Sequence, residues 1–432
     1  MIDLKYIRSN PEQVRQAIRN KNEKADLDAL LELDETRRKL QFDFDNLKAE
    51  QNKVSQTIAQ KKKNGEDASE LLQEMGTVAE RLKAINAELS AANTQLDALL
   101  LTIPNLPHPG VPVGRDETAN KQVKTWGEPP AFDFEPADHL ALADKNQLLD
   151  LTRGAKISGS GFPIYTGFGA RLERAVINFM LELHQQRHGY AELAVPVLVN
   201  RRTMTGTGQL PKLEADMYRV DEDDLFLIPT AEVPMTNIYA DEVLTLAQLP
   251  LKYVAYTPCF RREAGSYGKD TKGLQRLHQF NKVEMVRFVE PATSYAVLEE
   301  MLQDAEDILQ ALGLHYRVVE LCTGDLSFAS AKTYDIEVWA PGARKYLEVS
   351  SVSNFEDFQA RRANIRYRDK EGKVAFLHTL NGSGVATPRL MIALWETYQT
   401  AGLGLRLPSV LEPFLNQAVP GPDGVSGLAT NS

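Results

Sequence analysis

The sequence predicts an α+β protein in which a long antiparallel α-helical coiled-coil hairpin precedes an antiparallel β-sheet flanked by helices. Three observations favour this fold class. Residues 27–100 contain no proline and place apolar side chains at heptad spacing. Prolines within residues 103–113 then interrupt the helical pattern. After them, apolar strand-like runs alternate with segments of helical periodicity.

The first 103 residues are predicted to form a helical domain. Asn10-Pro11-Glu12 is typical of a helix start, and heptads follow from residue 27. They stop at Lys61-Lys62-Lys63-Asn64-Gly65, which suits a helix end, and resume at Leu71. Each arm of roughly 36 residues would reach about 55 Å at 1.5 Å per residue. Such heptads can also serve only as a dimerisation coil. The seam positions are Leu30, Leu33, Arg37, Leu40, Phe44, Leu47, Gln51, Val54 and Ile58, then Leu71, Met75, Val78, Leu82, Ile85, Leu89, Ala92, Leu96 and Leu99.

Residues 104–116 are predicted to be an extended linker, 117–415 the main domain and 416–432 a flexible tail. Helical periodicity covers residues 169–188, and a strand interrupted by Pro196 follows at 190–199. Further strands are expected at 252–260, 278–289, 317–321, 333–339 and 344–349, and helices at 293–312 and 389–400.

Composition limits the setting and the partners. With 43% hydrophobic and 25% charged residues, the chain is not wholly disordered. Cys259 and Cys322 are too few for a disulfide framework, so we expect a reducing cytoplasm and no structural zinc. No apolar run approaches the ~20 residues of a membrane helix. The net charge of −10 argues against nucleic acid, but residues 1–100 hold 16 basic and 18 acidic residues and are nearly neutral.

Two predicted strands carry charges on either side of a glycine-rich loop. Phe260-Arg261-Arg262-Glu263 ends one strand, and residues 278–284 open the next. Arginine can fork onto a phosphate, a glutamate can accept from an amine, and Phe280 offers a stacking face for a base. The alternative is a surface hairpin with solvated charges.

Three more segments carry candidate ligands. Glu348-Val349-Ser350-Ser351 offers oxygen ligands suited to Mg²⁺, although it could equally be a helix cap. Asn381-Gly382-Ser383-Gly384 precedes Arg389, which is expected in the first turn of a helix. Arg389 could bind an anionic ligand there or could simply be a surface arginine. Thr230-Ala231-Glu232 can hold an ammonium group or cap a helix. The sequence has neither a P-loop nor a Rossmann glycine pattern after a strand.

In this order, the motifs resemble those of the seryl-tRNA synthetases of bacterial type, a family of class II aminoacyl-tRNA synthetases. The resemblance runs from Met1-Ile2-Asp3-Leu4 to Tyr398 and includes Pro196 in the motif 1 strand. It implies a class II catalytic domain whose antiparallel sheet cradles ATP, and a homodimer joined around motif 1. The family usually has a small residue or glycine where this chain has Thr387-Pro388 before the motif 3 arginine.

The resemblance also implies roles for individual residues. Arg261 would contact the ATP α-phosphate, Glu263 the adenine amine, Phe280 the adenine ring and Arg389 the γ-phosphate. Arg261, Arg389 and Glu348 would be catalytic. The implied ATP site comprises Arg261, Arg262, Glu263, Leu277, Phe280, Glu348, Val349, Ser350, Ser351 and Arg389. The implied serine site comprises Thr230, Ala231, Glu232, Arg261, Glu284 and Ser383. The implied Mg²⁺ ligands are Glu348 and Ser351.

The expected function is that of a serine–tRNA ligase. Serine would react with ATP to give seryl-adenylate and pyrophosphate, and the seryl group would pass to the 3′ end of tRNA(Ser), and of tRNA(Sec) where present. The hairpin would grip the tRNA, with Lys53, Lys61, Lys62 and Lys63 as candidate phosphate contacts. Two alternatives are an activator that loads a carrier protein, against which the hairpin argues, and a scaffold with a degenerate body, against which the intact charged residues argue.

Overall fold

The computed structural model describes residues 1–264 and 272–415. The chain divides into two compact units, Met1–Pro104 and Asn105–Ser432. The predicted tail at 416–432 and most of the predicted loop at 265–273 lie outside the described residues. None of the described helices is both long and apolar enough to cross a bilayer.

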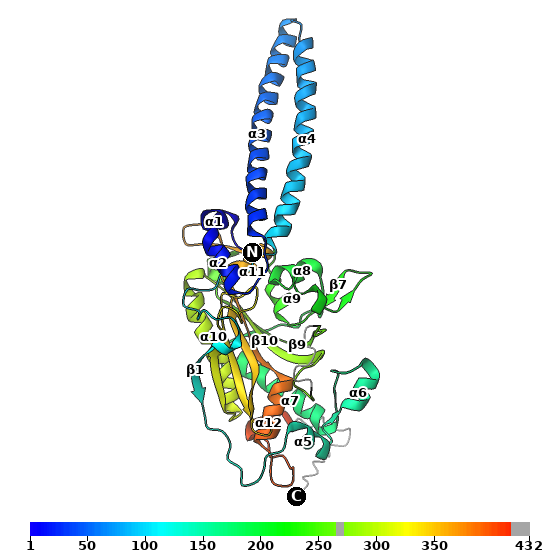
Figure 1. Ribbon diagram of the computed structural model, residues 1–432, viewed down its shortest axis with the longest axis vertical. Coiled ribbons are helices and arrows are strands. Elements are labelled where there is room, and N and C mark those ends of the chain that lie inside the picture. Colours follow the sequence, from blue (N-terminus) through cyan, green and yellow to red (C-terminus); the bar gives the residue numbers. More distant parts are fainter. Residues whose placement is uncertain (265–271, 416–432) are drawn as a thin grey trace. The chain divides into compact units, whose positions relative to one another are not determined.

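The first unit is helical. Helices α1 (Leu4–Ser9) and α2 (Pro11–Asn20) precede α3 (Leu27–Asn64) and α4 (Ser69–Leu100), which lie side by side as a hairpin (Figure 1). Helix α3 ends at Asn64 and is capped by Gly65, whose φ of 77° is the left-handed conformation that glycine adopts without strain. The predicted hairpin is therefore confirmed, with the turn where the lysine run ends.

Heptad side chains hold the hairpin together, and a buried carboxylate ties its base to α1. Leu47 of α3 packs with Val78 and Leu82 of α4. Near the base, Asp34 is buried and receives three guanidinium groups, the first from Arg8 of α1 at 3.0 Å. Arg37 supplies the second at 3.1 Å. This ion pair gives the Arg37 guanidinium a charged partner through Nη2 at a seam position, although its buried Nε has no hydrogen-bond partner among the described residues.

The second unit is built on an eight-stranded sheet with the order β1-β11-β12-β13-β16-β10-β9-β4. Every neighbouring pair is antiparallel except β4 and β9, which run parallel. The strands are β1 (Lys121–Trp126), β4 (Ala191–Glu192), β9 (Leu251–Phe260), β10 (Gln279–Val289), β11 (Tyr316–Glu320), β12 (Lys332–Ala340), β13 (Lys345–Asn354) and β16 (His378–Ala386).

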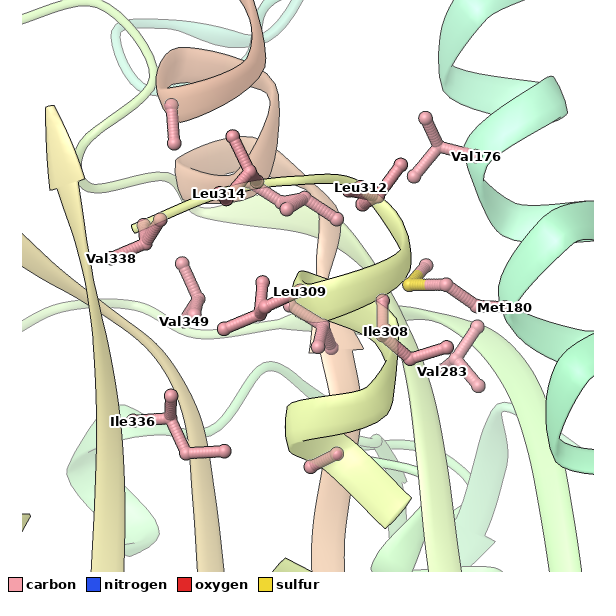
Figure 2. Close-up of a cluster of buried hydrophobic side chains, with 14 of the residues drawn as sticks. Val176, Met180, Val283, Ile308, Leu309, Leu312, Leu314, Ile336, Val338 and Val349 are labelled. Atoms are coloured by element: carbon pink, nitrogen blue, oxygen red, sulfur yellow. The ribbon is translucent and has the colours of Figure 1, made fainter. Parts of the chain in front are cut away.

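Three long helices pack on one face of this sheet: α7 (Gly167–Gln186), α10 (Ser294–Ala311) and α12 (Thr387–Thr397). In Figure 2, Met180 of α7 lies near Ile308 of α10 and Val283 of β10, all within one apolar cluster. Alternate β10 residues such as Val286 belong to a separate cluster. That cluster includes residues of the short helices α9 (Glu232–Thr236) and α11 (Phe358–Ala363), so these lie on the opposite face.

Smaller elements complete the second unit. Strands β5, β7 and β6 form one small sheet, β15, β14 and β8 another, and β2 pairs with β3. The helices are α5 (His139–Lys145), α6 (Leu151–Ser158), α8 (Arg201–Thr207) and α13 (Glu412–Leu415), and the strands are β2 (Leu149–Asp150), β3 (Ile164–Tyr165), β5 (Leu198–Asn200), β6 (Arg219–Val220), β7 (Leu225–Leu227), β8 (Val243–Thr245), β14 (Arg366–Arg368) and β15 (Val374–Phe376).

The structure corrects two sequence-based expectations about the strands. The strand predicted at 190–199 is two short strands, β4 and β5, because Pro196 lies between them and has no backbone N–H for a ladder. The strand predicted to end at Val349 continues to Asn354, because its last residues pair with β16. The segment 381–384, for which no strand was predicted, is part of β16.

Candidate active site

A cavity of about 640 Å³ opens on the sheet face opposite the three long helices. Lys282 and Glu284 of β10 line it, whereas the intervening Val283 packs under α7 and α10. The structure brings nearly all sequence-predicted residues to this cavity. Those lining it are Thr230, Glu232, Arg261, Glu263, Leu277, Phe280, Glu284, Glu348, Val349, Ser350, Ser351, Ser383 and Arg389.

Two of the residues predicted for the ATP and serine sites do not line the cavity. Ala231 is fully buried in the cluster beneath it. The Arg262 side chain instead donates from Nη1 to the backbone carbonyl of Ala215 at 3.2 Å. Both are neighbours of lining residues, so they contribute to the shape of the site and not to its surface.

A β-bulge at Val349 explains how Glu348 and Ser351 share the cavity. In a regular strand, residues three apart point to opposite faces. Here Glu348 pairs with Glu337 and Ser351 with Asp335, while the register shifts by one residue between the pairs. Since residues 335 and 337 lie on one face of β12, the extra residue brings both candidate ligands to the same side.

A second bulge sets the opposite wall. The register between β10 and β16 shifts between Val283 and Glu284, so that Glu284 stands directly across from Ser383. Gly384 is the residue passed over, and a Cβ on it would lie 2.4 Å from the Nε2 atom of His184 in α7. Only glycine fits this close approach to α7. The bulge at Gly384 places the Ser383 side chain on the cavity face.

Two buried carboxylates lie at the floor, and they have different partners. Lys282 forms an ion pair with Glu284, and both side chains are almost fully buried. Glu232 Oε1 instead accepts from the neutral amide of Gln359 at 2.6 Å. Burial, together with the nearby Glu284 carboxylate, raises the pKa of Glu232 to about 7. Thr230 accepts from the Glu232 backbone N–H at 3.2 Å, so this segment is a helix start as well as part of the cavity.

Cationic side chains cover the other end of the cavity. The Arg261 guanidinium lies 5.1 Å from the centroid of the Phe280 ring. Arg389 donates from Nη1 to the Glu348 carbonyl at 2.9 Å and to its carboxylate at 3.3 Å. Glu263 forms an ion pair with Arg276. Arginines next to an aromatic ring face and a carboxylate suit a nucleoside triphosphate.

The residues preceding Arg389 are compatible with a helix start. Pro388 lies in the first turn of α12, where its missing N–H costs nothing. Thr387 donates its hydroxyl proton to the buried Glu173 carboxylate at 2.8 Å. The departure from the family at these positions therefore still places Arg389 at the helix start.

Glu348 and Ser351 are oxygen donors of the kind that Mg²⁺ prefers. The Glu348 side chain is 48% exposed, so it can turn toward a ligand. Among the described residues, no group of three or more His, Cys, Asp or Glu side chains could hold a metal ion by itself. The pair fits a cation that completes its coordination with phosphate oxygens and water.

The four candidate lysines are not among the residues that line this cavity and belong to α3 of the first unit. Lys61, Lys62 and Lys63 occupy its last turn, where positive charge complements the helix dipole. Lys53, Lys62 and Lys63 are exposed, and Lys61 is half-buried.

Comparison with known families covers most of the chain. Residues 1–107 match the seryl-tRNA synthetase N-terminal domain, and residues 214–398 match the tRNA synthetase class II core domain (G, H, P, S and T). A serine–tRNA ligase of Geobacter sulfurreducens is 53% identical over 416 residues, which span 96% of this chain and 98% of the relative.

The chain belongs to the seryl-tRNA synthetase family. A serine–tRNA ligase of Desulfitobacterium hafniense is 52% identical over 96% of this chain and 99% of the relative. The crystal structure of seryl-tRNA synthetase from Pyrococcus horikoshii complexed with ATP superposes with a TM-score of 0.90, at 36% identity, over 96% of this chain and 98% of that one. The predicted class II fold and coiled-coil arm are therefore confirmed.

Sequence reasoning missed three residues that shape the cavity. Lys282 could have been found, since it lies at period two between Phe280 and Glu284 on a predicted strand. Arg276 borders the loop at 265–271, where no local pattern indicates its ion pair with Glu263. Gln359 is distant in sequence from Glu232, and only the folded chain brings its amide to that carboxylate.

Proposed function

We propose that this chain is a serine–tRNA ligase, which activates L-serine with ATP and transfers the seryl group to tRNA. One observation carries the proposal. A single cavity combines a cationic end formed by Arg261 and Arg389 with a floor formed by the buried carboxylates Glu232 and Glu284. The first suits a triphosphate, and the second suits a small zwitterionic amino acid with a polar side chain.

ATP binds at the cationic end. Phe280 stacks on the adenine, in place of the Arg261 guanidinium that now lies near its ring. Glu263 accepts from the adenine amine, and Leu277 closes the edge of the base site. Arg261 moves to the α-phosphate, where its fork also meets the serine carboxylate. Arg389 holds the γ-phosphate from the start of α12.

Serine binds over the floor of the cavity. Glu232 and the Thr230 hydroxyl hold its ammonium group, while Glu284 and Ser383 face its hydroxyl. Alanine would leave these buried partners without a hydrogen bond, which disfavours its activation.

The chemistry needs no covalent enzyme nucleophile. The serine carboxylate attacks the α-phosphorus in line, pyrophosphate leaves, and a terminal ribose hydroxyl of tRNA then displaces AMP from the adenylate. Arg261 and Arg389 stabilise charge that develops on the phosphate oxygens. Glu348 and Ser351 would hold Mg²⁺, which when bound neutralises phosphate charge. Backbone around Val349 and Ser350 shapes that edge through the bulge.

The arm formed by α3 and α4 binds the tRNA. Its exposed Lys53, Lys62 and Lys63 face solvent and can contact backbone phosphates, with Lys61 beside them. The substrate is tRNA(Ser), and also tRNA(Sec) in a host that makes it. The protein acts in the cytoplasm, where this substrate is charged.

We further infer a homodimer joined through the region from β4 to β5. Strand β4 ends the described sheet after only two residues and leaves its outer edge without a strand. Leu198, which follows Pro196, is 42% exposed. A second copy paired there would cover both the edge and this apolar surface. Light scattering of the purified chain should give twice the monomer mass.

The deciding experiment is amino-acid-dependent ATP–pyrophosphate exchange with each of the twenty amino acids. Exchange should require serine, and its absence with serine would refute the proposed activity. Deleting residues 28–99 should then abolish charging of tRNA(Ser) while serine-dependent exchange continues. Equal charging by the shortened and full chains would refute the role of the arm.

A further inference from the structure

Gln359 occupies the junction of four elements beneath the cavity. It lies in α11 and is 1% exposed. Its Nε2 atom donates to Glu232 Oε1 at 2.6 Å and to the Thr207 carbonyl at 3.2 Å. Its Oε1 atom accepts from the Thr379 hydroxyl at 2.7 Å. The amide thus joins α11 to α8, α9 and β16, and both of its donor positions are used.

These partners fix the amide in one orientation. The Glu232 carboxylate and the Thr207 carbonyl can only accept, so they require the NH₂ side of the amide. The Thr379 hydroxyl supplies the proton that the amide oxygen accepts. Turning the amide over would place its oxygen against two acceptors and leave groups unpaired, which is costly at a position this buried.

The neutral partner distinguishes Glu232 from the other carboxylate at the floor. Glu284 is paired with the ammonium group of Lys282, which offsets its negative charge. Glu232 instead accepts one hydrogen bond from the neutral amide of Gln359, and this contact leaves the negative charge of its carboxylate available to a cationic ligand. Gln359 holds Oε1 of this carboxylate, and the side chain of Asn381, which lines the cavity, also interacts with it.

We propose that Gln359 is a positioning residue for amino acid recognition, which orients the Glu232 carboxylate toward the substrate ammonium group through the chain Thr379–Gln359–Glu232. This inference rests on the proposed serine activation. Gln359 does not line the cavity, whereas Thr207 and Glu232 do, so it acts through them. Its loss should weaken serine binding without affecting the ATP end of the cavity.

Serine-dependent exchange measured with Gln359→Leu tests this directly. Losing a hydrogen bond to a charged group corresponds to about a 10- to 100-fold rise in the KM for serine. The KM for ATP should stay within about twofold. Thr379→Val removes the first donor of the chain at nearly unchanged volume and should give a smaller rise, about 3- to 10-fold, and Thr379→Ser should restore the wild-type KM.

Gln399→Leu is the matched control. Gln399 is also a buried glutamine whose amide accepts from the Ala137 N–H at 2.8 Å and donates to the Ala137 carbonyl at 3.1 Å, away from the cavity. Its replacement should lower thermal stability and leave the KM for serine unchanged. An unchanged KM for serine in folded Gln359→Leu, or in Thr379→Val if the first variant does not fold, would overturn the inference.

Two failures can be told apart. If the wild-type chain shows no serine-dependent exchange, the proposed activity fails whatever the variants do. If the wild-type chain is active and Gln359→Leu raises the two KM values equally, then only the positioning role is refuted. A fall in kcat with both KM values unchanged would likewise mark a purely structural role.

Discussion

Replacing Glu232 with glutamine is expected to stabilise the fold at pH 8 while weakening serine binding. The Glu232 pKa is raised from 4.5 to about 7 in the folded chain, chiefly by burial and then by Glu284. The folded state therefore favours the protonated form. The contribution of Glu232 protonation to the stability of the fold is complete below pH 4.5 and is lost as the pH rises through about 7. A pKa difference of this size between the folded and unfolded chain corresponds to about 3 kcal/mol of unfolding free energy.

Glutamine cannot ionise, so Glu232→Gln escapes this loss and can still accept from Gln359. Unfolding in guanidinium chloride should show the variant to be more stable at pH 8 by up to about 3 kcal/mol, with the advantage shrinking toward pH 5. Glu88→Gln on the exposed face of α4 should change stability little at either pH. A Glu232→Gln variant that is less stable than wild type at pH 8, or whose advantage is independent of pH, would refute the reasoning.

Three further changes probe other parts of the chain. Gly384→Ala should lower the free energy of unfolding by about 2 kcal/mol or more and reduce exchange, because the new Cβ would lie 2.4 Å from the His184 imidazole of α7. The control Gly76→Ala in α4 adds a Cβ that meets nothing within 4 Å, so it should be neutral or stabilising. Equal melting temperatures for the two variants would contradict this. The double change Lys62→Glu and Lys63→Glu should lower tRNA charging at least tenfold and leave serine-dependent exchange intact, and unchanged charging would exclude these contacts. Arg389→Lys keeps the positive charge but removes the guanidinium, whose Nη1 donates to Glu348 and whose Nε donates to Gln275, so the kcat of exchange should fall about 10²-fold. A wild-type kcat would count against its role.

The arm was predictable because its signals are local. Heptads specify which faces of α3 and α4 meet, and the Lys-Asn-Gly sequence specifies where α3 ends. Seam contacts such as those of Leu47 with Val78 and Leu82 lie within the hairpin itself. The strands β9, β10, β11 and β12 were likewise found within one or two residues from their apolar runs.

The candidate site was only partly predictable because it depends on register between distant strands. The spacing of Glu348 and Ser351 looks wrong for a strand until the bulge at Val349 is known. No strand was predicted for the small residues around Gly384, yet they form a buried strand whose glycines admit close neighbours. No single-sequence pattern reports such pairings, so the family resemblance supplied what periodicity did not.

The pairing of β1 with β11 has a consequence for how the chain is made. About 190 residues separate Trp126 from Tyr316, so at about 5–20 residues per second a ribosome needs about 10–40 s to produce the partner of β1. During that time β1 is a strand without its neighbour. Its sequence Lys-Gln-Val-Lys-Thr-Trp is mostly charged or polar, which discourages pairing with other nascent chains. We therefore expect the polar composition of this edge to disfavour aggregation of the unfinished protein.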